Sequence, residues 1–251
     1  MKTLKHNSIL WGFLLQAAVI CGILAVCQHH DIWFGVGIKY FLFQLFNVLI
    51  PGTAIFLLFD IKIKDSITAV GIGYSLGLIF LVIEYLVLIS LGLQLYSFFV
   101  SGIFTIISVV IVYKKKCFHE YLSCPHAWTF CLGCITLILL LGIFAVSDVN
   151  TIPEHIDSNG YYVDWLFWTG NNISLTKGFP PQDFRLCGET FNYHYFSSII
   201  IAQSFFITKI DIGILSFYFS FIIPAISLVT VAYTLLKTLI KTPVFMVLSL
   251  I

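Results

Sequence analysis

The sequence predicts an all-helical, polytopic membrane protein, and two observations carry this prediction. Of the 251 residues, 59% are hydrophobic and only 10% are charged, whereas roughly a quarter of the residues in a soluble domain are charged. The mean hydropathy is +1.00, and the apolar residues fall in runs of about 20, long enough for helices that cross a bilayer core of roughly 30 Å. A soluble globular fold is excluded, and no basic stripe indicates binding to nucleic acid.

Six hydrophobic runs are the predicted transmembrane helices. They cover residues 8–27, 40–59, 67–92, 96–113, 128–146 and 213–236. The first run is long for the apolar part of a signal peptide and no clear cleavage site follows it, so we expect it to be retained. Pro51, Gly52 and Pro224 lie inside runs and are expected to kink their helices.

Lysines determine the predicted orientation, because the cytoplasmic ends of transmembrane helices are enriched in them. With a cytoplasmic N-terminus, nine lysines fall on the cytoplasmic side: Lys2, Lys5, Lys62, Lys64, Lys114, Lys115, Lys116, Lys237 and Lys241. This arrangement requires residues 195–236 to cross the membrane once. The apolar segment 195–208 is short for a membrane span, so we expect it to lie along, or dip into, the outer leaflet.

These assignments divide the chain into three parts. Residues 1–146 hold five transmembrane helices, residues 147–210 form one long extracytoplasmic loop with short interfacial helices, and residues 211–251 hold a transmembrane helix and the start of a further span. Because the final apolar run is only ten residues long, we expect the chain to be the N-terminal part of a longer protein. Long loops are usually functional, which directs attention to residues 147–210.

This loop contains most of the chemically reactive side chains, including six of the twelve acidic residues and Arg185, the only arginine. Asp157, Tyr161, Asp164 and Trp168 follow one another at helical spacing and would share a face. Since tyrosine and tryptophan favour the bilayer interface, we expect a short interfacial helix that presents acids beside the membrane. An aromatic anchor with incidental acids is the alternative.

Three other features have both a functional and a structural interpretation. The planar guanidinium of Arg185 suits a phosphate, but a salt bridge to Asp183 or Glu189 is the favoured alternative. Glu84 lies within a predicted span, where an acid is a functional candidate, yet no basic residue lies at a comparable depth, so hydrogen-bonded or protonated packing is favoured. The cysteines and histidines of residues 117–134 match no standard zinc spacing, and no metal site is assigned to them.

The loop resembles the GT-C superfamily of membrane glycosyltransferases, which use sugars linked to lipid phosphates. The matching residues are FPPQD at 179–183, Gly188-Glu189 and NYHYF at 192–196. They are closest to poorly characterised bacterial and archaeal members with a PP-x-D…G…NYYYF motif. The five preceding spans match only in being apolar. The resemblance implies an integral, multi-pass protein of a bacterial plasma membrane.

The resemblance also implies roles for individual residues. A carboxylate near the membrane would act as general base on the acceptor hydroxyl or help to hold a divalent metal ion, the one cofactor that we consider. Asp164 is the first candidate and Asp157 the second, although Trp168 stands where the family pattern has a histidine. The predicted substrate-binding residues are Arg185, Lys177, His194, Asp183 and Tyr193.

The predicted function is therefore transfer of a sugar from a polyprenyl-phosphate donor to an extracytoplasmic glycan, lipid or protein. Two alternatives belong to other classes: a transporter or flippase for a lipid-linked glycan, and a non-catalytic membrane scaffold. Transporters usually place polar residues near the bilayer midplane, in broken helices. This chain concentrates its polar residues in the loop, which favours the enzyme.

Overall fold

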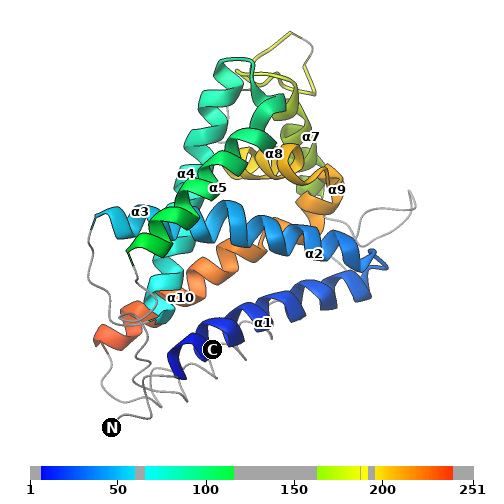
Figure 1. Cartoon of the computed structure of the whole chain (residues 1–251). Coiled ribbons are helices and arrows are strands. Elements are labelled where there is room, and N and C mark those ends of the chain that lie inside the picture. Colours follow the sequence, from blue (N-terminus) through cyan, green and yellow to red (C-terminus); the bar gives the residue numbers. More distant parts are fainter. Residues whose placement is uncertain (1–6, 60–65, 116–162, 187, 192–195, 240–251) are drawn as a thin grey trace.

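The computed structural model describes residues 7–59, 66–115, 163–186, 188–191 and 196–239 (Figure 1). These residues form an all-helical bundle without a β-strand among them. Four helices in this part of the chain are long and apolar enough to cross a membrane: Phe34–Leu58, Ile67–Ser90, Gln94–Lys114 and Ile212–Ala232. The prediction of an all-helical, polytopic protein is confirmed. The predicted span 128–146 and the apolar end of the chain lie outside the described residues.

The helices follow the predicted order, with one boundary displaced. Helix α1 (Asn7–His29) matches the first predicted span. The second span starts at Phe34 rather than residue 40, since α2 (Phe34–Phe43), η1 (Gln44–Leu49) and α3 (Ile50–Leu58) form one continuous helix. The exposed Lys39 lies within this helix and does not interrupt it. Helices α4 (Ser66–Ser90) and α5 (Ser97–Lys114) form the next two spans, joined by a short turn.

Both proline-containing spans include a π-helical segment just before the proline. In the second span, η1 is π-helical, and the Ile50 N–H bonds to the Leu45 carbonyl five residues back. The Phe46 carbonyl thereby loses its α-helical partner, and the next possible donor is Pro51, which has no N–H. Thr105 of α5 supplies the missing hydrogen bond, with its Oγ1 donating to the Phe46 oxygen at 2.8 Å.

The last described span also combines a π-helical segment with a proline. It consists of α9 (Ile212–Ile214), the π-helical η4 (Leu215–Phe219) and α10 (Ile222–Leu239), and Pro224 lies five residues after Phe219. The hydroxyl of Tyr40 donates to the Phe219 carbonyl at 2.7 Å, and the two rings stack with centroids 4.6 Å apart. In each span, a side chain of a neighbouring helix thus donates to a backbone carbonyl near the proline, and in the second span this bond replaces the donor that Pro51 lacks.

Helix α4 is the centre of the bundle, and glycines allow its backbone to touch α3. A Cβ atom on Gly52 would lie 1.8 Å from the Gly73 carbonyl oxygen, and one on Gly77 would lie 2.0 Å from the Val48 carbonyl oxygen. Such close approach through small residues is the usual way in which membrane helices associate. On another side of α4, Gly71 lies against Thr230 of α10.

The described part of the predicted loop and the ends of α5 and α10, which the sequence predicts to be cytoplasmic, lie at opposite ends of this bundle. The short helix α8 (Phe196–Thr208) runs across α4 and α5 near the turn that joins them, and α7 (Val163–Lys177) lies beside it (Figure 1). The other end of α4 meets the end of α10 through Thr68 and Thr234, whose hydroxyls are 3.0 Å apart. The side of the membrane that each end faces stays a prediction.

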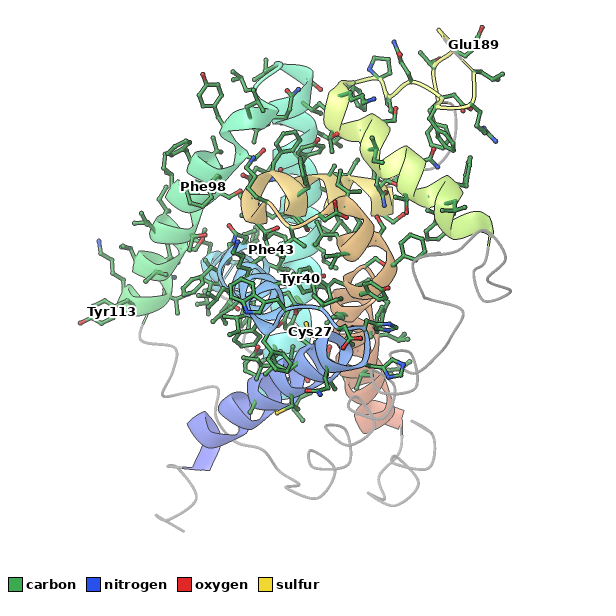
Figure 2. All side chains as sticks on the ribbon, turned by 90° about the vertical axis from the view of Figure 1, so that its right-hand side faces the viewer. Cys27, Tyr40, Phe43, Phe98, Tyr113 and Glu189 are labelled. Atoms are coloured by element: carbon green, nitrogen blue, oxygen red, sulfur yellow. The ribbon has the colours of Figure 1, made fainter. Side chains whose placement is uncertain are left out.

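Helix α8 covers most of the apolar segment 195–208, and it packs against other helices of the bundle. About half of its residues are buried against α4, α5 and α7: Ser198, Ile199, Ile201, Ala202, Gln203, Ser204 and Phe206. Protein covers much of this helix, whereas the outward face of α5 is apolar and exposed along its length, from Phe98 to Tyr113 (Figure 2). Its placement in the outer leaflet remains a prediction.

Candidate functional site

The candidate site is a compact hairpin that follows α7. Gly178 ends the helix, and the chain then reverses so that Gln182 pairs with Thr190 in an isolated antiparallel bridge. The Asp183 N–H bonds to the Glu189 oxygen at 2.9 Å, and the Phe191 N–H bonds to the Pro181 oxygen at 2.8 Å. Gly188 has a φ angle of 88°, a left-handed value that glycine adopts without strain.

This hairpin is fixed to α7 by one hydrogen bond and by aromatic packing. The hydroxyl of Ser174 donates to the Gln182 carbonyl. The Phe184 ring lies over Gly170, where a Cβ atom would be only 2.6 Å from it. The Phe167 ring has its centroid 5.8 Å from that of Phe184 and 6.0 Å from that of Phe191. Only a small residue at position 170 allows this packing.

Helix α7 is itself bound to the membrane helices through buried polar contacts. The Asn172 side chain donates from Nδ2 to the Ser216 hydroxyl of η4 at 2.7 Å. The Tyr85 hydroxyl of α4 donates to the Leu175 carbonyl at 2.9 Å. Because Asn172 is buried, the sequon Asn172-Ile173-Ser174 does not present a free amide for glycosylation in this fold.

Arg185 is held in place within the hairpin by an acid and an aromatic ring. Its Nε and Nη2 atoms donate to the two carboxylate oxygens of Asp183 at 2.9 and 2.6 Å, and its backbone N–H donates to the same carboxylate at 2.9 Å. Its guanidinium carbon lies 4.6 Å from the centre of the Phe167 ring. The salt bridge expected as the alternative interpretation of Arg185 is thus present. Arg185 remains 54% exposed, and Nη1 takes no part in these hydrogen bonds.

The ion pair shifts the protonation of both partners. Hydrogen bonds from the Arg185 side chain, then from its backbone N–H, lower the pKa of Asp183 to about 2. The side-chain hydrogen bonds to Asp183 raise the pKa of Arg185 above its ordinary value. Asp183 is therefore ionised at neutral pH and is not suited to act as a general base, which needs a pKa nearer the working pH.

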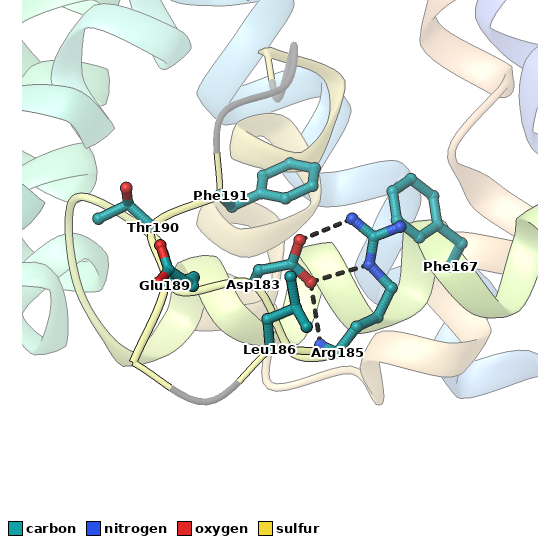
Figure 3. A pocket seen from close by; sticks show the side chains of 7 residues that line it. All are labelled: Phe167, Asp183, Arg185, Leu186, Glu189, Thr190 and Phe191. Carbon is teal, nitrogen blue, oxygen red and sulfur yellow. Dashed lines mark hydrogen bonds and ion pairs between the residues drawn. The ribbon is translucent and has the colours of Figure 1, made fainter.

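An open pocket of about 760 Å³ lies beside this ion pair (Figure 3). It is lined by Phe167, Asp183, Arg185, Leu186, Glu189, Thr190 and Phe191. One guanidinium and two carboxylates give the lining a formal charge of −1 when both acids are ionised. A hydroxyl group and aromatic carbon complete the wall. This mixture of donors, acceptors and apolar surface suits a polyhydroxylated ligand better than a free phosphate.

The structure brings some of the predicted site residues together and separates others. Asp164 lies in the first turn of α7, three residues before Phe167, or about 4.5 Å along the helix axis. Lys177 ends the same helix, exposed and about 15 Å along the axis from Phe167. Lys177 does not line the pocket. Asp157, Tyr193 and His194 lie outside the described residues.

Five of the residues that line the pocket were not predicted as ligand contacts: Phe167, Leu186, Glu189, Thr190 and Phe191. Glu189 had been considered only as an ion-pair partner for Arg185, and Phe167 and Thr190 had no role. The signal for Glu189 and Thr190 was their place directly after Gly188, because a left-handed glycine returns the chain toward Asp183. Phe167 has no comparable signal, since only the folded hairpin shows which face of α7 it covers.

No cluster of three or more histidine, cysteine or acidic side chains suitable for a metal ion occurs in the part of the chain that the structure describes. The comparisons with known proteins also assign no family. No protein-family model, curated protein or solved structure matches the chain. The resemblance to the GT-C superfamily therefore rests on the loop motif alone and stays a prediction.

Proposed function

We propose that the chain is part of a GT-C-like glycosyltransferase that transfers a sugar from a polyprenyl-phosphate donor to an extracytoplasmic acceptor. The observation that supports this proposal is the pocket on the hairpin that carries the family-like motif. It is open, it combines hydrogen-bonding groups of both signs with aromatic carbon, and it lies on a membrane protein with an all-helical bundle. A lipid-linked sugar would present its hydroxyl groups at such a surface.

The roles of the residues follow from their chemistry. Arg185 would donate to sugar or phosphate oxygens through the N–H groups that Asp183 leaves available. Glu189 and Thr190 would bind sugar hydroxyls. Asp164, one turn before the pocket residue Phe167, is the candidate general base that would deprotonate the acceptor hydroxyl. A cation near the leaving phosphate would stabilise the charge that develops as the glycosidic bond breaks.

The test is sugar transfer by the full-length protein in proteoliposomes with polyprenyl-phosphate sugars as donors. Asp164→Asn removes the base and should lower kcat at least 100-fold, with the protein stably inserted, because general bases contribute about 10²–10⁴-fold. The matched control is Asp31→Asn, an exposed acid outside the site whose left-handed φ of 52° asparagine also adopts. Equal transfer by the Asp164→Asn variant would remove Asp164 from the mechanism. Absence of transfer in the wild type would contradict the enzyme proposal.

One observation favours transport as a second candidate. Glu84, Ser101 and Gln203 form a polar cluster inside the helical bundle, and transporters place polar groups inside membrane helices. Movement of a fluorescent polyprenyl-linked sugar across proteoliposomes without an acceptor would support this function. If neither transfer nor movement is measured, a scaffold role becomes the better explanation.

A further inference from the structure

The polar cluster inside the bundle joins three helices through one acid. Glu84 of α4 is only 7% exposed and lies six residues before the end of that helix, about 9 Å along its axis. The hydroxyl of Ser101 in α5 donates to Glu84 Oε1 at 2.5 Å. The Gln203 side chain of α8 donates from Nε2 to the Ser101 hydroxyl oxygen at 3.3 Å.

One atom of this cluster lacks the donor that it needs. Gln203 is fully buried, and its Oε1 atom has no hydrogen-bond partner. The amide of Gln203 also faces the Glu84 carboxyl group. An ionised carboxylate only accepts hydrogen bonds and cannot satisfy a second acceptor, whereas a protonated carboxyl group has one O–H to donate. A buried amide oxygen without a donor destabilises the fold.

No ion pair joins Glu84 to Lys177 of α7 or to another charged group among the described residues. Helix α8 has no titratable side chain, and neither does α3, which packs on α4 and α5. In α5, the titratable groups are Tyr113 and Lys114, at least 12 residues beyond Ser101, or about 18 Å along the axis. On α4, the neighbouring Tyr85 donates its hydroxyl to Leu175. Lys209 follows α8 and lies over the Phe205 and Phe206 rings.

We propose that Glu84 is a proton-binding site that holds α8 against α4 and α5. Its carboxyl proton donates to Gln203 Oε1 and completes a ring of hydrogen bonds in which Gln203 donates to Ser101 and Ser101 donates to Glu84. Loss of the proton places a carboxylate against the amide oxygen and loosens α8. Helix α8 begins at Phe196, directly after the NYHY segment of the predicted extracytoplasmic loop. Proton binding at Glu84 is therefore connected to the position of that loop. This proposal does not depend on the proposed sugar transfer.

The first test is infrared spectroscopy of the full chain in lipid nanodiscs. The difference between wild type and Glu84→Gln at neutral pH should contain the carbonyl band of a protonated carboxylic acid. Ser101→Ala should shift this band because it loses a hydrogen bond. Ser108→Ala, which changes a buried serine two turns further along α5, should leave the band in place. A difference spectrum that contains only carboxylate bands would overturn the proposal.

The second test measures the consequence for α8 by hydrogen exchange. Raising the pH should increase exchange of the α8 amides, after correction for intrinsic rates, in the wild type. Glu84→Gln should retain protection of α8 at every pH, because glutamine keeps a donor and cannot ionise. Two results would contradict the proposal. One is loss of α8 protection in Glu84→Gln already at neutral pH, and the other is loss of the protonated-acid band on addition of Na⁺, which would identify a cation site instead.

Discussion

The contact between α3 and α4 and the contact between α7 and its hairpin are made in opposite ways. In the first, glycines bring two backbones together, so Gly52 and Gly77 leave no space for a Cβ atom. In the second, side chains make the contact: Ser174 donates a hydrogen bond to the hairpin, Arg185 lies over the Phe167 ring and Phe184 packs on Gly170. The first contact depends on shape and leaves no room for an added side-chain atom. The second depends on specific donors and acceptors and responds to pH.

The largest predicted effect is an added methyl group at the α3–α4 contact. Gly52→Ala places a Cβ atom against the backbone of Gly73, which cannot move without separating the helices. We expect a loss of about 3 kcal/mol or more, or failure to fold, since overpacking typically costs 1–3 kcal/mol even where side chains can yield. Thermal unfolding in lipid or mild detergent measures this loss. The matched control is Gly102→Ala in α5, where a Cβ atom meets nothing within 4 Å and the change should be neutral or slightly stabilising.

A smaller effect is expected where α7 is joined to α4. Tyr85→Phe removes the hydroxyl that donates to the Leu175 carbonyl and leaves a buried acceptor unpaired. The expected loss is about 1–2 kcal/mol of unfolding free energy. Tyr113→Phe is the control, because Tyr113 is exposed at the far end of α5. Equal stability of Tyr85→Phe and wild type would mean that this hydrogen bond does not hold α7.

The smallest expected effect is the pH response of the hairpin. The pKa of Asp183 is lowered in the folded chain, to about 2, so its ion pair contributes stability above the unfolded pKa near 3.8. That contribution is lost as the pH falls from about 4 toward 2. Hydrogen exchange of the Asp183 and Phe191 amides should report this opening, while the glycine contact stays unchanged. An Asp183→Asn variant should show no such transition, and an identical acid transition in that variant would assign the opening to another group.

Hydropathy was sufficient to predict the fold class and most of the spans, because the bilayer requires long apolar helices. It could not locate the start of the second span at Phe34. The charged Lys39 lowers the hydropathy near this start, although its exposed side chain leaves the helix continuous. The pairing of Arg185 with Asp183 was foreseen because the two residues are only two positions apart. The assembly of Glu84, Ser101 and Gln203 was not, since Ser101 and Gln203 are 102 residues apart and meet only after α8 has folded across the bundle.

The two π-helical segments have a consequence for how this chain tolerates changes in length. Each segment accommodates one residue more than an α-helix would over the same turns. A single-residue deletion within η1 (Gln44–Leu49) would restore regular helix and rotate one half of the span by about 100° relative to the other. Tyr40 and Gly52, on either side of η1, would then no longer face Phe219 and Gly73 at the same time. The rotational register of the span is therefore set by one inserted position, which links the contacts of its two halves.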